Sequence, residues 1–423
     1  MHLEFPKGFL WGAATAAHQV EGNTHNDWTE WERMNAERLA KEAQKRHNGD
    51  ASWRFPEAFN PQNYISGRAC DHYNRFAEDF DIAKSLGHNA HRFSIEWSRV
   101  EPEEGVFDEK AIAHYREVLL ALRQRGIEPF VTLWHFTNPS WFAKKGGWER
   151  KENIDAFLRY VARVVDRLDG VRYWIVINEP TVYTGAAYIG GLFPPQRKSL
   201  FTAFLVLKNL LTAHRRAYAL LHRRREERIY VGTSHNLHYF VPYRRWWIPD
   251  HLAVAFVTYI ADLYQLRIVR RHCDFIGLNY YFRDVIKFVL GGGAYGLADR
   301  VNPNQIVSDL GWDMYPRGIY QVLIRLRRYQ KPIYITENGV ADAYDEKRAD
   351  FIHEHLQWVH KAIAEGADVR GYFHWSLLDN FEWDKGFWPR FGLVEMDYKT
   401  LERKIRPSAR VYQRICAMNA LPE

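Results

Sequence analysis

The sequence of 423 residues predicts an α/β protein, built as a closed barrel of eight parallel strands that are each followed by a helix. Three observations lead to this fold class. Short apolar runs alternate with amphipathic stretches, polar side chains recur where these runs end, and no Ser-, Pro- or Gly-rich linker divides the chain. This length would ordinarily give two or three domains, but an eight-stranded barrel with elaborated loops can reach roughly 400 residues as one domain. We therefore expect residues 1–423 to form a single domain.

Eight apolar runs have the length and composition of buried strands. They cover residues 10–17, 90–97, 129–134, 173–177, 230–233, 275–278, 333–336 and 372–375. Between them, residues 111–125 and 153–168 carry apolar side chains at helical spacing, as Ile112, Tyr115 and Leu119 show in the first stretch. Strands that alternate with helices imply a parallel sheet. The polar residues 44–67 and the Gly- and Asn-rich residues 291–304 are predicted to be long surface loops.

The composition is aromatic and basic. Phe, Trp and Tyr make up 15% of the chain, with 16 Trp, which indicates either a very aromatic core or a surface that stacks on flat ligands. The net charge is +7, but acids interrupt the short arginine runs and no recognition signature accompanies them. We expect these runs to be solvated and expect no nucleic-acid partner.

The cysteines and apolar runs bear on the compartment. Cys70, Cys273 and Cys416 are widely spaced and odd in number, which favours a reducing cytosol over a disulfide framework or a zinc site. The first residues lack the apolar core of a secretory signal, and the runs 200–207 and 252–260 are shorter than the roughly 18 residues that span a bilayer. We expect a cytoplasmic protein without a membrane partner, and a homo-oligomer stays open.

Polar side chains follow most of the apolar runs at the same end. They are Gln19, His135, Asn178–Glu179, Asn279 with Tyr281, Glu337 and Asp379–Glu382. In a barrel of this kind the C-terminal strand ends form one rim, and catalytic residues come from several of them. We therefore expect these side chains to converge on one pocket.

Two of the rim residues form a carboxylate pair. Glu179 ends an apolar run and precedes Pro180, so it should turn out beside an apolar wall with the raised pKa of a general acid. Glu337 also ends a strand, and Gly339 permits a tight exit, while Arg92 and Tyr281 are candidates to keep the carboxylate ionised. Two carboxylates in different environments are what glycoside hydrolysis requires. Each alone could equally be a salt-bridged rim residue.

Other catalytic classes lack their motifs. The sequence contains no HExxH, no GxGxxG after the first strand, no phosphate-binding loop and no GxSxG. No pair of its 19 histidines has zinc-ligand context. We expect neither a metal nor a cofactor.

Six blocks carry a resemblance to a known family. They are FLWGAATAAHQVEG (9–22), RFSIEWSR (92–99), NEP (178–180), ITENG (335–339), HWSLLDNFEW (374–383) and RFGLV (390–394). Together, and in this order, they resemble glycoside hydrolase family 1 from about residue 5 to residue 415. The resemblance implies a (β/α)8 TIM barrel and a retaining β-glycosidase that needs no cofactor.

The resemblance also implies residue roles. Glu179 would be the acid/base, Glu337 the nucleophile, and Asn178 the partner of the sugar 2-hydroxyl. The other implied positions are Gln19, His135, Glu382 and Trp383 on the glycone, Trp375 under the ring, Arg92, Asn279 and Tyr281 around the nucleophile, and Trp312 on the aglycone side. Two departures are Phe136-Thr137-Asn138-Pro139, where many members have Trp-Asp-Leu-Pro, and Val176, where a Thr is common.

Glu382 decides the expected substrate. A carboxylate that faces the sugar 4- and 6-hydroxyls accepts two hydrogen bonds and repels a 6-phosphate. We expect an exo-acting enzyme that removes terminal non-reducing β-D-glucosyl residues from oligosaccharides and aryl glycosides through a covalent intermediate on Glu337, with β-D-galactosyl and β-D-fucosyl residues left open. The alternatives are a phospho-β-glycosidase, a transglycosylase, or a non-catalytic carbohydrate-binding protein on the same scaffold.

Overall fold

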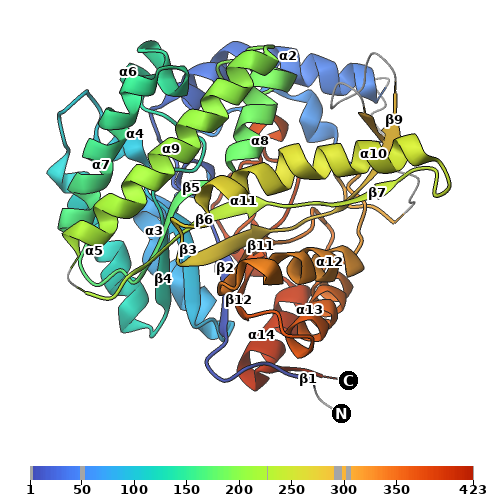
Figure 1. The fold of residues 1–423 in the computed structure, drawn as a ribbon. Coiled ribbons are helices and arrows are strands. Elements are labelled where there is room, and N and C mark those ends of the chain that lie inside the picture. Colours follow the sequence, from blue (N-terminus) through green and yellow to red (C-terminus); the bar gives the residue numbers. More distant parts are fainter. Residues whose placement is uncertain (1–2, 48–52, 226, 290–297, 302–305, 423) are drawn as a thin grey trace.

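Eight parallel strands close into a barrel in the computed structural model, which describes residues 3–47, 53–225, 227–289, 298–301 and 306–422 (Figure 1). The strands are β2 (Leu10–Ala14), β3 (Ala90–Ser94), β4 (Glu128–Thr132), β5 (Tyr173–Asn178), β6 (Tyr230–Asn236), β8 (Phe275–Asn279), β11 (Ile333–Asn338) and β12 (Val369–Trp375). Neighbours in sequence pair in parallel around the ring, and β12 closes it against β2. Each predicted run overlaps one of these strands, so the predicted fold class is confirmed.

Aromatic side chains fill the inside of the barrel. Phe130 on β4 stacks on Tyr173 on β5 with ring centroids 4.2 Å apart, and it also packs on Tyr334 and Phe373 from β11 and β12. All four are buried. Part of the aromatic excess is therefore barrel core, below the strand ends that carry the polar residues.

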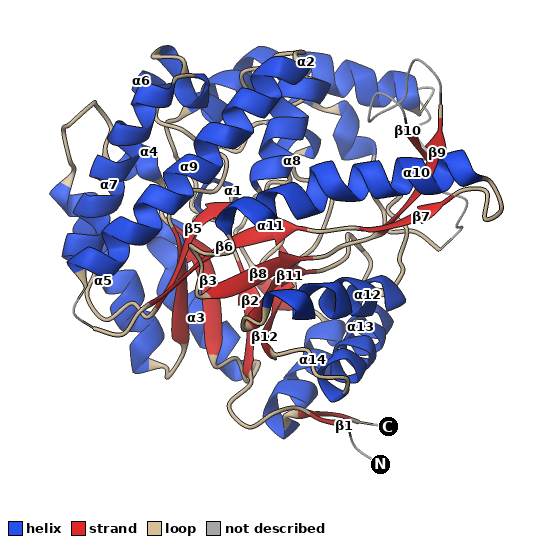
Figure 2. Ribbon diagram, viewed as in Figure 1, coloured by secondary structure: helices blue, strands red, loops and turns tan. Residues whose placement is uncertain are grey.

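Helices surround the barrel (Figure 2). The longer ones are α2 (Asp27–Arg46), α3 (His72–Ser85), α5 (Glu109–Gln124), α7 (Ile154–Arg167), α9 (Leu200–Arg224), α10 (Ile248–Val257), α12 (Arg317–Leu326), α13 (Arg348–Ala364) and α14 (Pro407–Met418). The short ones are α1 (Ala17–Val20), α4 (Trp97–Val100), α6 (Ser140–Lys144), α8 (Pro180–Thr184) and α11 (Tyr264–Val269). The two helices predicted from apolar spacing are α5 and α7, and α5 begins where the Asp108 side chain accepts from the amides of Lys110 and Ala111.

Small sheets lie outside the barrel. Strands β7 (Tyr239–Pro242), β9 (Arg283–Phe288) and β10 (Ala298–Val301) form one, and β13 (Val394–Met396) pairs with β14 (Arg403–Ile405). Strands β1 (Leu3–Glu4) and β15 (Ala420–Leu421) hold the chain ends side by side. The domain assignment to residues 1–423 stays a prediction.

The predicted surface loops need correction. Residues 44–46 continue α2, and the helical turns Pro56–Phe59 and Pro61–Tyr64 follow, with Tyr64 buried. Their polar composition concealed this burial because the apolar side chains in them are few. Within 291–304, residues 298–301 form strand β10, and the rest of that prediction lies outside the described residues.

The helical segment Ile248–Val269 also corrects an expectation. The apolar run 252–260 is part of a continuous helical segment of 22 residues with a mean hydropathy of 1.5 in its most apolar window. By length and composition alone, this segment is sufficient to cross a membrane, and a third of that window is buried in the protein. The run looked too short in the sequence because Asp262 interrupts it.

Candidate active site

A cavity of about 360 Å³ opens at the C-terminal ends of the barrel strands. Its walls carry His135, Phe136, Glu179, Thr181, Val182, Gly185, Phe193, Asn236, His238, Ala261, Tyr281, Phe282, Leu310, Trp312, Glu337, Trp375, Glu382, Trp383, Asp384, Lys385 and Phe391. The predicted residues Gln19, Arg92, Asn178 and Asn279 are fully buried behind these walls, where they contact lining or neighbouring side chains. Most of the strand-end residues that were predicted to converge therefore lie at or directly behind one cavity.

Glu179 occupies a strained turn. It follows β5 with φ +43° and ψ 61°, the left-handed region that a non-glycine residue rarely adopts, and Pro180 then starts α8. Its Oε1 accepts from Asn236 Nδ2 at 3.0 Å and from Asn279 Nδ2 at 2.8 Å. Burial raises the pKa of Glu179 to about 8, and the negative charge of Glu337 adds to the rise. A carboxyl group with this pKa is largely protonated at neutral pH, as a general acid must be.

Glu337 has two donors, one at each carboxylate oxygen. Arg92 on β3 donates to Oε1, and the Tyr281 hydroxyl donates to Oε2 at 2.5 Å. These donors compensate the negative charge of a carboxylate that is only 3% exposed. Gly339 permits a close approach of two backbones, because a Cβ there would lie 1.8 Å from the carbonyl oxygen of Trp375. The tight exit that the sequence predicted is thus a steric requirement between β11 and β12.

Hydrogen bonds of side-chain amides connect the surroundings of the two carboxylates. Asn178 Oδ1 accepts from Arg92 at 2.7 Å and from Asn279 at 3.2 Å, which places its Nδ2 toward His135 Nε2 at 3.1 Å. Thr336 donates to Asn279 Oδ1 at 2.6 Å and orients that amide in turn. Burial, and then the charge of Arg92, hold the pKa of His135 well below its usual range. His135 is therefore neutral and accepts at Nε2, so its Nδ1 carries the proton.

A third carboxylate lines the cavity. Burial, and next the charge of Asp384, raise the pKa of Glu382 to about 8. Its Oε2 has no partner among the described residues, and neither has Oε1 of Gln19. Gln19 directs its Nε2 to the carbonyl of Phe381 at 2.8 Å, next to Glu382 in the chain. Unsatisfied acceptors of this kind in a buried site are suited to hydroxyl groups of a ligand.

Aromatic rings complete the walls. The His135 ring lies nearly parallel to both Trp375 and Trp383, with centroids 6.1 and 5.9 Å away. Trp312 packs against Tyr281 and Phe282 with centroids 5.6 and 5.0 Å away. Flat apolar faces beside a few polar groups match the alternating C–H and hydroxyl surfaces of a sugar ring. A second part of the aromatic excess therefore lies in the walls of this cavity.

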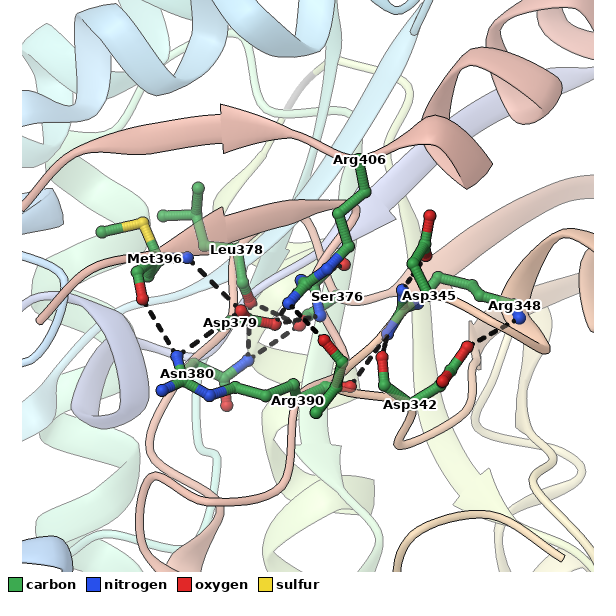
Figure 3. Close-up of polar contacts among 12 residues, drawn as sticks. Asp342, Asp345, Arg348, Ser376, Leu378, Asp379, Asn380, Arg390, Met396 and Arg406 are labelled. Atoms are coloured by element: carbon green, nitrogen blue, oxygen red, sulfur yellow. Dashed lines mark hydrogen bonds and ion pairs between the residues drawn. The ribbon is translucent and has the colours of Figure 1, made fainter. Parts of the chain in front are cut away.

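The segment between Trp375 and Glu382 is held from below by the network in Figure 3. Asp379 accepts from Arg406 and from the amide of Gly392, both at 2.8 Å, and Arg390 lies 3.5 Å away. Burial opposes ionisation, but Arg406 and Arg390 hold the pKa of Asp379 below its usual range. Asn380 donates to Ser376 Oγ at 2.8 Å. Asp379 thus points away from the cavity and anchors the segment that carries Glu382.

Several lining residues were missed in the sequence. Asn236 ends β6 and contacts Glu179, and the strand-end rule would have found it if the predicted fifth strand had continued beyond residue 233. Asp384 and Lys385 follow the predicted block directly, and their side chains lie 2.6 Å apart. Phe193 and Leu310 have no sequence signal, because they come from loops that only the fold brings to the cavity.

The two departures from the family pattern, residues 136–139 and Val176, lie beside the cavity and in the buried core, respectively. Phe136 lines the cavity with φ +73°, while Asn138 Oδ1 accepts from Trp134 and Trp148, each at 3.0 Å. This block therefore still forms a rigid wall beyond His135. Val176 is buried, and Glu179 takes its hydrogen bonds from Asn236 and Asn279.

The described residues include no group of three or more His, Cys, Asp or Glu side chains that could hold a metal ion.

A (β/α)8 barrel with paired carboxylates and aromatic walls at its strand ends defines the class of glycoside hydrolases with a TIM barrel. The family model "Glycosyl hydrolase family 1" matches residues 1–255 and 260–421. The chain belongs to this family and is a β-glucosidase-type glycoside hydrolase. The resemblance stated from the sequence is therefore confirmed.

Individual relatives agree with the family assignment. The chain is 33% identical to "Beta-glucosidase A" of Thermotoga maritima over 466 aligned positions, covering 99% of each protein. Its structure is similar to a beta-glycosidase from Pyrococcus horikoshii, with a TM-score of 0.89, 39% identity and coverage of 100% of this chain and 97% of the other. A Thermotoga maritima beta-glucosidase in complex with glucoimidazole gives a TM-score of 0.87 at 31% identity, covering 99% of this chain and 100% of the other.

Proposed function

We propose that the enzyme is a retaining exo-β-glycosidase that removes terminal non-reducing β-D-glucosyl residues from oligosaccharides and aryl glycosides. The observation that carries the mechanism is the opposed surroundings of the two carboxylates. Glu179 has a pKa of about 8 in an apolar wall with amide donors, whereas Glu337 faces Arg92 and Tyr281. One carboxyl group is prepared to give a proton and the other to attack.

In the first step the Glu337 carboxylate attacks the anomeric carbon and the bond to the leaving oxygen breaks. Glu179 gives its proton to that oxygen, so the aglycone leaves as a neutral alcohol. The product of this step is a covalent glycosyl-enzyme on Glu337. Arg92 and Tyr281 keep the attacking oxygens in place until the bond forms.

In the second step water replaces the aglycone. The Glu179 carboxylate takes one proton from the water, whose oxygen attacks the anomeric carbon and releases Glu337. Two inversions at one carbon leave the product with the β configuration. This mechanism requires carboxyl groups about 5–5.5 Å apart.

The glycone contacts follow from the unsatisfied groups. Glu382 would accept from the 4- and 6-hydroxyls, and Gln19 Oε1 from a neighbouring hydroxyl. His135 and Asn178 face each other beside the nucleophile, which suits the 2- and 3-hydroxyls. Trp375 and Trp383 would lie against the ring, and Trp312 near the aglycone. We also consider β-D-galactosyl and β-D-fucosyl residues as substrates, because a carboxylate can accept from either epimer of the 4-hydroxyl.

The test is the anomeric configuration of the first product from a nitrophenyl β-glucoside, followed by NMR. We expect β-glucose before mutarotation, and α-glucose would overturn the mechanism. A panel of nitrophenyl β-glucoside, β-galactoside, β-fucoside and 6-phospho-β-glucoside, ranked by kcat/KM, tests the substrate assignment. A higher rate on the phosphorylated glycoside would overturn it. Product analysis at high acceptor concentration would show a transglycosylase as transfer products that exceed hydrolysis.

Two further expectations belong to this proposal. The buried thiols of Cys70, Cys273 and Cys416 are free, which supports a cytoplasmic location. A small-molecule sugar is the expected substrate, and the oligomeric state stays a prediction for sedimentation analysis.

A further inference from the structure

One side of the cavity entrance continues into an exposed apolar surface. Most of the large apolar side chains that the described chain exposes lie between Ile189 and Ile260. They are Ile189, Leu192, Leu200, Phe201, Phe204, Tyr243, Trp246, Trp247, Ile248, Leu252, Phe256, Tyr259 and Ile260. We call this set the apolar face. Soluble proteins rarely expose so many large apolar side chains together unless the surface binds a partner.

The helical part of the apolar face is one side of a helix. Ile248, Leu252 and Phe256 follow each other at intervals of four residues in α10, which places them along one stripe. The opposite side packs on the outer sheet, where Ala253 and Val257 contact Phe240 and Ile286. The helix therefore has one side bound to the protein and one apolar side without cover from the described residues.

The two parts of the face are joined through aromatic rings. Tyr264 lies between Phe204 on α9 and Tyr259, with ring centroids 5.9 and 6.5 Å away. Below them, Leu207 and Leu211 pack against Val269. Figure 1 shows α10 and α11 as one long rod whose α11 end reaches α9. The start of α9 and the rod therefore form a continuous surface.

The exposed charged side chains of the two segments that carry this surface are all positive. The sequence contains no Asp or Glu between Glu179 and Glu226. Between Arg228 and Arg271 it contains only Asp250 and Asp262, and both are fully buried. The exposed cations of these two segments include Arg197, Lys198, Lys208, Arg245, Arg267, Arg270 and Arg271, while Arg244 pairs with Asp250. On a neighbouring element, Glu149 contacts Arg197.

The helix cannot leave the protein to span a membrane. Asp262 forms an ion pair with Arg325 on α12 and lies within hydrogen-bond distance of the amide of His238, and Gln265 donates to Thr181 at 3.2 Å. These polar groups would be unpaired in hydrocarbon, at a cost of several kcal/mol each. A helix fixed in this way could present its exposed apolar side to a membrane only from the plane of the interface.

We propose that the apolar face binds the surface of an anionic lipid bilayer, with Trp246, Phe201 and Phe256 entering the headgroup region. Exposed Trp and Tyr side chains favour that depth, and the surrounding cations match anionic headgroups. Ala261 and Gly185 line the cavity and lie close in the chain to Ile260 and Ile189. Docking therefore places the cavity entrance beside the lipid.

The test is binding of the full chain to sedimented vesicles of phosphatidylcholine, alone or mixed with phosphatidylglycerol. We expect binding to the mixed vesicles at low salt, and much weaker binding to neutral vesicles or at high salt. The K198E/R245E variant should bind less by about fivefold or more for each cation changed. The R33E/K404E variant, whose exposed cations lie elsewhere, is the matched control and should bind as the parent does.

A second pair of variants tests the apolar contribution. Changing Phe201, Trp246 and Phe256 to Ser should lower binding by at least about tenfold, because three large side chains no longer enter the lipid. The control changes Met34, Val106 and Leu120, which are exposed on other elements, to Ser. Hydrolysis of a soluble nitrophenyl glucoside should be unchanged in both, since none of these residues lines the cavity. Trp246→Ser alone, at a side chain 96% exposed, repeats the test without risk to packing.

Three outcomes would overturn the proposal. Equal binding of parent and triple variant, or no binding of the parent to anionic vesicles, would exclude a lipid surface. If the parent also sediments as a dimer that the F201S/W246S/F256S variant dissociates, the apolar face would instead be the contact between two copies.

Discussion

Arg92 contacts Glu337 across the barrel, from β3 to β11, with β12 and β2 between them in the ring. The same guanidinium donates to Asn178 at 2.7 Å, beside Glu179 in the chain. Both partners of the ion pair are almost completely buried. One side chain therefore ties the two carboxylate-bearing strands together.

This ion pair predicts strong coupling in a double-mutant cycle. Arg92→Gln should leave the Glu337 carboxylate buried without its cation and destabilise the fold by about 3–5 kcal/mol. Glu337→Gln in the same background should restore part of that stability, because no unpaired charge remains. Urea unfolding of the four proteins measures the coupling. Additive losses would contradict the assigned ion pair.

Removal of Glu337 should abolish turnover. Glu337→Gly should lower kcat on the order of 10⁶-fold, as expected when the attacking group of a catalytic unit is lost. Azide should restore activity on an activated aryl glucoside and give the α-glucosyl azide, because it enters from the face that Glu337 vacated. Glu179→Gly is the matched control and should give the β-azide, formed from the glycosyl-enzyme. A β-azide from the Glu337 variant would exclude it as the nucleophile.

The raised pKa of Glu179 predicts the alkaline limb of the pH profile. Below about pH 8 the carboxyl group is protonated and can act as the acid, so kcat/KM should fall as the pH rises through this value. Glu179→Gln should remove this limb and cost about 10²–10⁴-fold for a poor leaving group. An activated leaving group should lose much less in the first step. Since burial and Asp384 also raise the pKa of Glu382 to about 8, Glu382→Gln is the control that should keep the limb.

The proposed role of Glu382 predicts that its removal lowers kcat/KM by different factors on two glycosides. Glu382→Ala removes the acceptor of the 4- and 6-hydroxyls of glucose, but only of the 4-hydroxyl of fucose. One hydrogen bond between neutral groups contributes about 0.5–1.5 kcal/mol, so kcat/KM should fall about two- to tenfold more on the β-glucoside than on the β-fucoside. Equal losses on the two nitrophenyl glycosides would show that Glu382 does not bind the 6-hydroxyl.

The network below Glu382 predicts an indirect effect on binding. Asp379→Asn leaves Arg406 and Arg390 without their carboxylate and should destabilise the fold by about 3–5 kcal/mol. The segment that carries Glu382 should loosen, so KM should rise more than kcat falls. Glu402→Gln, an exposed change nearby, should stay within about 0.5 kcal/mol. An unchanged KM in the Asp379 variant would contradict the anchoring role.

Much of the site could be predicted because barrel strands end in the same place. Glu179, Glu337 and Asn279 each end an apolar run, and parallel strands bring such ends to one rim. A turn at Glu179 was also anticipated from Pro180, although its strained left-handed backbone was not. Asn236 was missed because the predicted fifth strand stopped at residue 233, whereas Phe193 and Leu310 come from loops, which reach the cavity without leaving a local pattern in the sequence.

The sequence by itself determined the barrel, the family and the carboxylate pair, because these depend on local periodicity and on short motifs. Only the tertiary structure decided which groups surround each carboxylate. Burial, and next the negative charge of Glu337, raise the pKa of Glu179, while Glu337 pairs with the Arg92 guanidinium and accepts a hydrogen bond from Tyr281. It also decided that the helical segment Ile248–Val269 is held by buried Asp250 and Asp262 while its other side stays exposed. Burial and charge pairing are properties of the folded environment, so they cannot be read from a residue and its neighbours in the chain.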